Sequence, residues 1–439
     1  MNAIASFAQA EAYLLSTIDE KRSRYTSYKL DRMQAFLREL GDPHRAYPSV
    51  HVGGTSGKGS TSTMIAAALQ ASGRRTGLHT KPHLRSVTER ARIDGEPVGR
   101  ERFAQLLEEM LTAIERIAPQ HGTPTYYETT LALAFLHFAR ERVDAAVVEV
   151  GLGGRLDGTN VLDPAVATIT SLGYDHTEIL GDTLEEIAFE KAGIAKPGVP
   201  LVLANVPQVA EAVIERQAAA VGAPLVRVRD VVRAGPAEAI AKGQRFAATT
   251  QRGEYDVRLA SLGIFQCTNA ATAIAVLEAL PDSLRPQRDA IERGFAAFAL
   301  PGRMELFEGR PPVVMDIAHN AEKASLLAQS LRERFPGRRI HCVVAIGESK
   351  DARQIVAMLA ALPATFTFTE FSAPGRTPIP AARLAAIAES LGTWGRAVGD
   401  PIEALTVARR MAGAHDVVVV TGSTFVVAAL REWYAPAAA

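Results

Sequence analysis

Short apolar runs alternate with amphipathic stretches along most of the chain. In the first part, segments such as Ala145 to Val150 have the length and character of buried strands, whereas segments such as Arg100 to Ala118 repeat apolar residues at helical spacing. The same alternation starts again after Pro301. Because strands that alternate with helices are typical of a parallel sheet covered by helices, the pattern predicts an α/β protein with a mostly parallel, doubly wound sheet in each half.

The expected elements end where Gly, Pro, Asn and Asp gather. In the first half the expected strands are 47–52, 75–80, 145–150, 165–170, 201–204 and 225–228. The expected helices there are 3–16, 30–40, 61–71, 100–118, 127–142, 184–195 and 269–280, with a hairpin at 91–97 and antiparallel structure at 245–259. In the second half the expected strands are 313–316, 341–347, 365–371 and 417–420, and the expected helices are 321–335, 351–362, 380–391, 402–412 and 425–433.

Length and composition narrow the class of protein. With 439 residues the chain exceeds the usual size of a single core, so we expect two domains, 1–298 and 299–439. Its 48 basic and 48 acidic residues cancel, and no basic stripe favours nucleic acid. Strand-length apolar runs and the lack of a signal-peptide stretch indicate a cytoplasmic protein with no membrane partner. Cys267 and Cys342 are too few for a disulfide framework, and we expect both to be buried apolar fillers.

The ten residues from His51 to Ser60 read HVGGTSGKGS and lie between an expected strand and an expected helix. Strand, glycine-rich turn and helix form the architecture of a phosphate-binding loop, because glycines let backbone N–H groups converge on phosphate oxygens at the positive end of the helix. Lys58 is placed to reach terminal phosphates, and the Ser60 hydroxyl to ligate Mg²⁺. Gly59 separates the two, so the loop departs from the usual spacing. The alternative is a Gly/Ser-rich loop without a ligand.

Two polar residues follow buried strands of the first half. Glu149 ends an apolar strand, and ligands of α/β sheets bind at the carboxyl ends of strands, which favours magnesium ligation. The alternative is a salt bridge to Arg155. His176 follows the strand ending at Thr170 and suits a second metal position, although beside Asp175 it is equally consistent with an ordinary surface histidine.

Other candidates are less specific by sequence alone. Lys191 lies on the expected helix 184–195, where a solvated lysine is the simpler interpretation. Arg90 and Arg92 either clamp a carboxylate substrate or face water.

In the second half, Asp316 and His319 close its first strand after Arg303, and we expect them to close over a nucleotide that the first domain holds in the cleft between the domains. Capping of the next helix by Asn320 is an alternative that leaves His319 unexplained.

Together these ordered motifs resemble the folylpolyglutamate synthase/dihydrofolate synthase family of the Mur ligase superfamily. Residues 51–60 resemble the family's HVAGTNGKGS, and residues 149–160 resemble its EVGLGGRLDATN. The other matches are 82–84 with 89–90 to SPHL…ER, 175–176 to DH, 190–194 to EKAGI, 301–303 to PGR, and 316–320 to DGAHN. The likeness extends from the first helices to the last strand–helix pair.

The resemblance implies both a fold and a reaction. It implies an N-terminal P-loop Mur-ligase ATPase domain and a smaller, Rossmann-like C-terminal glutamate-ligase domain. Such enzymes use ATP and Mg²⁺, here two ions, to phosphorylate the carboxylate of a pterin-type acceptor. The amino group of L-glutamate then attacks the acyl phosphate. The family is mostly monomeric, and a monomer is expected.

The resemblance also assigns roles to single residues. It implies catalytic roles for Lys58, Lys191 and His176, with Lys191 carbamylated. The implied metal ligands are Ser60, Glu149 and His176. The implied nucleotide contacts are Gly54, Thr55, Ser56, Gly57, Lys58, Gly59, Ser60, Asn269, Arg303, Asp316 and His319. The implied acceptor contacts are Lys81, His83, Arg90, Tyr127, Arg155 and Asp157.

The chain also departs from the family pattern. Ser56 replaces Asn, Lys81 replaces the Ser before Pro-His-Leu, Gly158 replaces Ala and Ala321 replaces Pro. Lys81 bears most on function, because an added cation near the acceptor leaves open whether that acceptor is dihydropteroate, a reduced folate, both, or a non-folate acid. One alternative is thus a Mur-like amino-acid ligase for another carboxylate. The other is a P-loop kinase or a nucleotide-regulated binding module.

Overall fold

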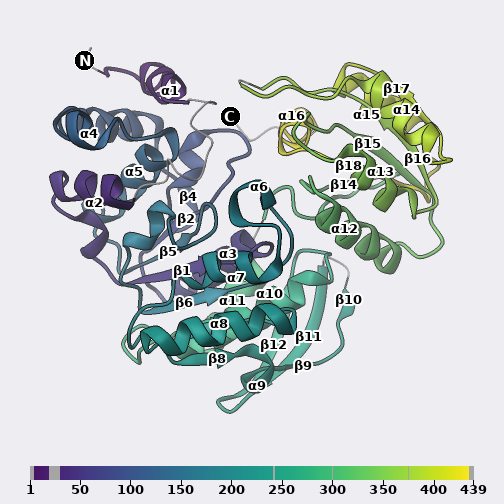
Figure 1. Cartoon of the computed structure of the whole chain (residues 1–439). Coiled ribbons are helices and arrows are strands. Elements are labelled where there is room, and N and C mark those ends of the chain that lie inside the picture. The colour runs from purple at the N-terminus through teal and green to yellow at the C-terminus, as the bar shows by residue number, and fades with distance from the viewer. Residues whose placement is uncertain (1–3, 19–29, 241–242, 299, 374, 435–439) are drawn as a thin grey trace. The chain divides into compact units, whose positions relative to one another are not determined.

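The computed structural model describes residues 4–18, 30–240, 243–298, 300–373 and 375–434. The chain forms two compact units. The first comprises residues 1–236, 246–258 and 267–298, and the second comprises residues 237–245, 259–266 and 299–439. Each unit contains an α/β sheet, as the alternation of apolar runs predicts (Figure 1).

The first unit is built on an eight-stranded sheet with the order β4-β3-β2-β5-β1-β6-β7-β8. Its strands are β1 (Ser49–Gly53), β2 (Thr76–His79), β3 (Arg92–Ile93), β4 (Glu96–Pro97), β5 (Ala145–Glu149), β6 (Val166–Ile169), β7 (Leu201–Leu203) and β8 (Leu225–Arg227). The six neighbouring strands β2, β5, β1, β6, β7 and β8 pair in parallel. Strand β3 pairs antiparallel with β2 and with β4. In register, Val52 of β1 pairs with Glu149 of β5 and with Thr168 of β6, so their carboxyl ends lie side by side.

Helices cover this sheet in groups. The core around Ala146 and Val148 of β5 packs against α1 (Phe7–Ser16), α2 (Leu30–Glu39), α4 (Arg100–His121) and α5 (Tyr126–Arg140). The core around β6 and β7 packs against α7 (Leu184–Ala192) and α8 (Gln208–Val221). Helix α3 (Lys58–Ala71) contacts β2 and β5 and is covered by α11 (Arg288–Ala297). That last approach requires Gly294, since a Cβ there lies 2.6 Å from the backbone of Ala67.

The remaining elements between residues 158 and 279 lie outside the eight-stranded sheet. They are a 3-10 turn, η5 (Gly158–Val161), and the helices α6 (Thr177–Leu180), α9 (Val228–Val231) and α10 (Phe265–Ala279). The short strands are β9 (Arg233–Ala234), β10 (Glu238–Ile240), β11 (Gly243–Thr250) and β12 (Gly253–Leu259). Antiparallel pairing of β11 with β9 and with β10 agrees with the alternation of residues 245–259.

The second unit has a six-stranded sheet with the order β13-β14-β18-β15-β16-β17. Its strands are β13 (Glu305–Phe307), β14 (Val313–Met315), β15 (Ile340–Val344), β16 (Ala364–Phe368), β17 (Gly395–Ala397) and β18 (Val417–Thr421). Only β13 is antiparallel. Its helices are α12 (Ala321–Arg334), α13 (Ala352–Ala360), α14 (Ala381–Ser390), α15 (Pro401–Met411) and α16 (Thr424–Tyr434), which match the expected helices.

Several elements differ from the sequence-based expectation. Helices α8 and α11 were not expected, because two of the four buried positions in each are alanine or glycine, which mark a buried face poorly. Strands β13 and β17 were not expected either; they lie at the two edges of the second sheet, and none of their residues is fully buried. Cys342 is buried as expected, but Cys267 is only half-buried. Across the described residues, no helix combines the length and apolarity that a membrane crossing requires.

A buried ion pair holds α2 against the start of α5, which carries the candidate site residue Tyr127. Nε of Arg32 donates to both carboxylate oxygens of Glu128, at 3.0 and 2.9 Å. Glu128 also accepts from the backbone N–H of Thr125 at 2.8 Å and thus completes the capping box of α5.

We expect Glu128→Ala to lower the free energy of unfolding by about 3–5 kcal/mol, because it leaves a buried guanidinium without this carboxylate. Urea unfolding measures the loss. The control is Glu39→Ala, whose partner Arg116 is exposed, with an expected loss below about 1 kcal/mol. Equal losses in the two variants would contradict the argument.

Candidate active site

The glycine-rich loop connects β1 to α3 in a conformation that only glycine adopts easily. Gly54 has φ +133° and Gly57, which caps α3, has φ +82°. Neither position has room for a side chain, since a Cβ on Gly54 lies 2.3 Å from Thr170 Oγ1 and one on Gly57 lies 2.3 Å from Asn269 Oδ1. The loop therefore requires glycine at both positions, and it leads into the first turn of α3, whose backbone N–H groups are of the kind that bind anions.

The segment after β6 holds this loop in place. The backbone N–H of Thr55 donates to Ser171 O at 3.0 Å, and that of Ser56 donates to Ser171 Oγ at 2.8 Å. In return, Thr170 Oγ1 donates to Ser56 O at 2.6 Å. The loop is thus fixed by bonds that do not involve Lys58. Sequence reasoning did not identify Thr170 and Ser171 as its anchors.

Two lysines converge on one carbonyl of the loop. Nζ of Lys58 donates to Gly54 O at 2.9 Å and to Thr55 O at 3.1 Å. Nζ of Lys191, on α7, donates to the same Gly54 O at 3.1 Å. Lys191 is 4 % exposed, so its interpretation as a solvated helix lysine is wrong. The ends of both lysine side chains therefore lie at one turn of the loop.

Glu149 lies at the neighbouring strand end. Its side chain is buried, and its Oε2 lies 3.4 Å from where a Cβ on Gly59 would be. The backbone N–H of Lys81 donates to this Oε2 at 3.1 Å. The alternative of a Glu149–Arg155 salt bridge is not favoured, because Arg155 instead forms a bidentate pair with Glu190, with a shortest distance of 2.7 Å.

The residues near Glu149 fit a magnesium ion. Ser60 is buried in the first turn of α3, and Glu149 Oε2 lies over the same turn. Among the described residues no three His, Cys, Asp or Glu side chains form a metal-holding group by themselves. Mg²⁺ commonly takes one carboxylate and completes its shell with water and substrate phosphates, so a single carboxylate beside the Ser60 hydroxyl suits it. His176 caps α6, with its ring nitrogens 3.9 Å from an Asp175 oxygen and 3.6 Å from a Glu178 oxygen.

A buried hydrogen-bond network centres on Asp157. One of its oxygens accepts from Tyr127 OH at 2.9 Å and from Thr159 Oγ1 at 2.6 Å, and the other accepts from the backbone N–H of Leu152 at 2.8 Å. His51 Nε2 lies 2.8 Å from Thr159 Oγ1. Burial, together with the Asp157 charge, raises the pKa of Tyr127 well above its usual value. Asp157 therefore shapes the 151–157 loop, a role that its sequence context did not reveal.

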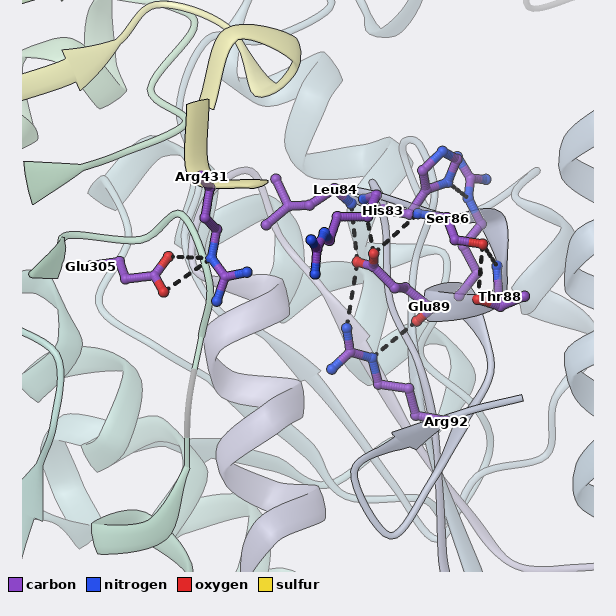
Figure 2. Close-up of polar contacts among 10 residues, drawn as sticks. His83, Leu84, Ser86, Thr88, Glu89, Arg92, Glu305 and Arg431 are labelled. Atoms are coloured by element: carbon purple, nitrogen blue, oxygen red, sulfur yellow. Dashed lines mark hydrogen bonds and ion pairs between the residues drawn. The ribbon is translucent and has the colours of Figure 1, made fainter. Parts of the chain in front are cut away.

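The loop after β2 is organised by Glu89 (Figure 2). Its carboxylate accepts from the backbone N–H groups of Leu84 at 3.0 Å and Ser86 at 3.1 Å. Arg92 also contacts this carboxylate, at 3.5 Å, so Arg92 supports the loop and does not simply face water. The motif Ser86-x-x-Glu89 is a capping box, which is a signal that the sequence contained.

The paired groups Arg90 and His83 lie on this same loop. Arg90 Nε donates to His83 Nδ1 at 3.1 Å, which requires that nitrogen to be unprotonated. Burial and the Arg90 charge lower the pKa of His83 to about 4, so its ring is neutral at physiological pH. Arg90 also stacks over Tyr126, 5.1 Å from the ring centroid. The loop therefore presents one guanidinium and one neutral imidazole together.

In the second unit the predicted residues gather at the end of β14. Asp316, which is buried, accepts from the backbone N–H groups of Met304 at 2.9 Å and Ala318 at 2.8 Å. Burial raises its pKa, although the charge of Arg303 opposes this. Burial and the Lys323 charge lower the pKa of His319 to about 3.

Two further contacts fix this end of the second unit. Asn320 does cap α12, by accepting from the Lys323 N–H at 2.9 Å. The turn that carries Arg303 is tied down by Glu305, which accepts from the Gly302 N–H at 2.8 Å and pairs with Arg431 of α16 at 2.8 Å (Figure 2).

Within the first unit the structure therefore brings the loop, Asn269, Lys191, Glu149 and Lys81 together. It groups Tyr127 with Asp157, Arg155 with Glu190, and His83 with Arg90. Arg155 also lies over the ring of Phe189, 5.5 Å from its centroid. The lysines, the buried carboxylate and the serine at the start of α3 are groups that suit a phosphate chain and a metal ion.

Comparison with known families gives a consistent result. The protein-family model of the Mur ligase middle domain matches residues 52–277. The family model of the Mur ligase, glutamate ligase domain matches residues 302–424. A Bacillus subtilis protein named dihydrofolate synthase/folylpolyglutamate synthase is 34% identical over 92% of this chain and 94% of its own length. A Mycobacterium tuberculosis protein with the same name is 36% identical over 87% of this chain and 82% of its own length.

Solved structures agree with these sequence relatives. Mycobacterium tuberculosis folylpolyglutamate synthase complexed with ADP superposes with a TM-score of 0.89 at 32% identity, covering 99% of both chains. Escherichia coli FolC in complex with DHPP and ADP superposes with a TM-score of 0.87 at 29% identity, again over 99% of both chains. The two-domain α/β fold of the present chain is thus the fold of these ligases.

Proposed function

Because the chain belongs to the folylpolyglutamate synthase/dihydrofolate synthase family of Mur ligases, we propose that it joins L-glutamate to the carboxylate of a folate or of dihydropteroate at the expense of ATP. It is an ATP-dependent acid–amino-acid ligase. The observation that supports the proposal best is the convergence of Lys58 and Lys191 on Gly54 O, beside the buried carboxylate at the end of β5.

The reaction needs two anions to meet. An acceptor carboxylate oxygen attacks the γ-phosphorus of ATP, and the bond to the bridging oxygen breaks to release ADP. The amino group of glutamate then attacks the acyl carbon and expels phosphate, leaving an amide. Lys58 and the N–H groups of the first turn of α3 neutralise the phosphate charge that builds up in the first step.

The finer assignments belong to the same proposal. Ser60, Glu149 and His176 hold two Mg²⁺ ions, which neutralise phosphate charge when bound. Lys191 is carbamylated and thereby becomes a carboxylate-like group. The nucleotide contacts are Gly54, Thr55, Ser56, Gly57, Lys58, Gly59, Ser60, Asn269, Arg303, Asp316 and His319. The acceptor contacts are Lys81, His83, Arg90, Tyr127 and Arg155, with Asp157 positioning Tyr127.

The proposal also covers the roles of the two domains and the cellular setting. Residues 1–298 bind ATP and residues 299–439 form the glutamate-ligase domain. The protein acts as a monomer in the cytoplasm.

Phosphate release measured in a matrix of substrates tests the function. We expect release only when ATP, Mg²⁺, L-glutamate and either dihydropteroate or tetrahydrofolate are all present, with the glutamylated product seen by mass spectrometry. Release with a peptidoglycan-type carboxylate in place of the pterin acceptor would instead identify a non-folate ligase. Phosphate transfer that needs no amino acid would identify a kinase and overturn the proposal.

A further inference from the structure

Lys81 lies where a cation affects the metal site. It lies two residues after the end of β2, and its backbone N–H donates to Glu149 Oε2 at 3.1 Å. Glu149 is only 4 % exposed, so little water screens the charges around its carboxylate. The side chain of Lys81 therefore begins one hydrogen bond away from the Glu149 carboxylate, which the proposed function assigns to Mg²⁺.

The ammonium group of Lys81 lies in the field of four other charges. Burial and the charge of Lys58 lower its pKa to about 8, with a smaller lowering from Arg90. The charges of Glu149 and Asp157 act in the opposite direction. The backbone hydrogen bond thus starts the Lys81 side chain beside Glu149, and the charges of the two residues act on each other.

We propose that Lys81 acts as a fixed positive charge beside Glu149 and weakens the binding of a divalent cation there. The inference rests on the proposed function, since it takes Glu149 as a metal ligand. A divalent ion on Glu149 is repelled by the Lys81 ammonium, and one lone pair of Oε2 is already used by the Lys81 N–H. Metal binding at this carboxylate then depends on the negative charge of a bound nucleotide. A neutral residue at position 81 removes that dependence.

The backbone hydrogen bond and the side-chain charge are separable, which makes the inference testable. Lys81→Met keeps the N–H donor and most of the side-chain length but removes the charge. Lys81→Ser introduces the residue that the family pattern has at this position, and Lys81→Arg retains the charge as the matched control.

Electron paramagnetic resonance of Mn²⁺, titrated with a non-hydrolysable ATP analogue present, measures affinity without turnover. We expect Lys81→Met and Lys81→Ser to bind Mn²⁺ on the order of tenfold more tightly than the wild type. We expect Lys81→Arg to remain close to the wild type. Unchanged or weaker Mn²⁺ binding in Lys81→Met would overturn the inference, provided that thermal unfolding shows the variant to be folded.

Glu149→Gln separates this inference from the proposed function. If it weakens Mn²⁺ binding while Lys81→Met has no effect, the metal assignment stands and the role of Lys81 fails. If Glu149→Gln has no effect, the metal assignment fails and takes the inference with it, even if Lys81→Met binds Mn²⁺ more tightly. Tighter binding in Lys81→Met together with weaker binding in Glu149→Gln supports both.

Discussion

Lys58→Ala is expected to reduce ATP-dependent ligation by at least about a hundred- to a thousandfold, the size of effect seen when one preorganised donor to developing charge is removed. In the structure its Nζ lies on Gly54 O and Thr55 O, within the turn that opens toward the first turn of α3. A phosphate bound there takes over those hydrogen bonds. Initial rates of phosphate release with saturating glutamate and acceptor measure the change.

The loop itself is expected to survive this substitution. Its backbone is held by bonds to Ser171 and Thr170, so the thermal unfolding midpoint should change little. Lys196→Ala is the matched control, because it removes a half-buried lysine whose Nζ bonds to Asn160 O at 2.9 Å. Wild-type rates in Lys58→Ala would refute the assignment of the phosphate loop.

Lys191→Ala is expected to lose nearly all activity, by about a hundredfold or more, and to recover part of it in the presence of formate or acetate. Substitution leaves a small space beside Gly54 O, where the lysine Nζ now lies 3.1 Å away. A carbamylated lysine carries a carboxylate-like group at this place, and a small free carboxylate restores its charge. Turnover measured against increasing acetate tests this directly.

The outcomes of that titration separate three roles. Wild-type activity of Lys191→Ala in the absence of acetate indicates that Lys191 has no part in the chemistry. Inactivity that acetate relieves, but that an equal ionic strength of chloride does not, supports the carbamate. Inactivity that no carboxylate relieves, in a folded variant, indicates that the ammonium group itself is required. Because Lys191 is buried, thermal unfolding of the variant accompanies each measurement.

The sequence predicted the large elements well because their apolar periods are strong. The strands β1, β5, β6, β15 and β18 are almost continuous runs of buried residues, as strands covered on both faces must be. Helix α8 was missed because alanines supply two of its four buried positions, and alanine does not distinguish a buried face from an exposed one. Strands β13 and β17 were missed because pairing at the sheet edges, and not local preference, creates them.

The burial of Lys191 was readable in principle. On α7, Ile187 and Ala188 lie on the buried face, and Lys191 follows Ile187 by four residues, which places it on that face. Its charge suggested the opposite, because charged residues on helices usually face solvent. The contacts of Asp157 and Glu89 are different, since they join backbone groups of irregular loops, whose directions no periodicity describes.

The close approach of Gly57 to Asn269 has a consequence for engineering the nucleotide contacts proposed for these two residues. A methyl group at position 57 overlaps the Asn269 amide, and the positive φ of Gly57 adds strain to any replacement. Positions 57 and 269 are therefore a coupled pair whose substitution effects do not add. Libraries that aim to change the accepted triphosphate should randomise both positions together, with small residues at one offered against large residues at the other.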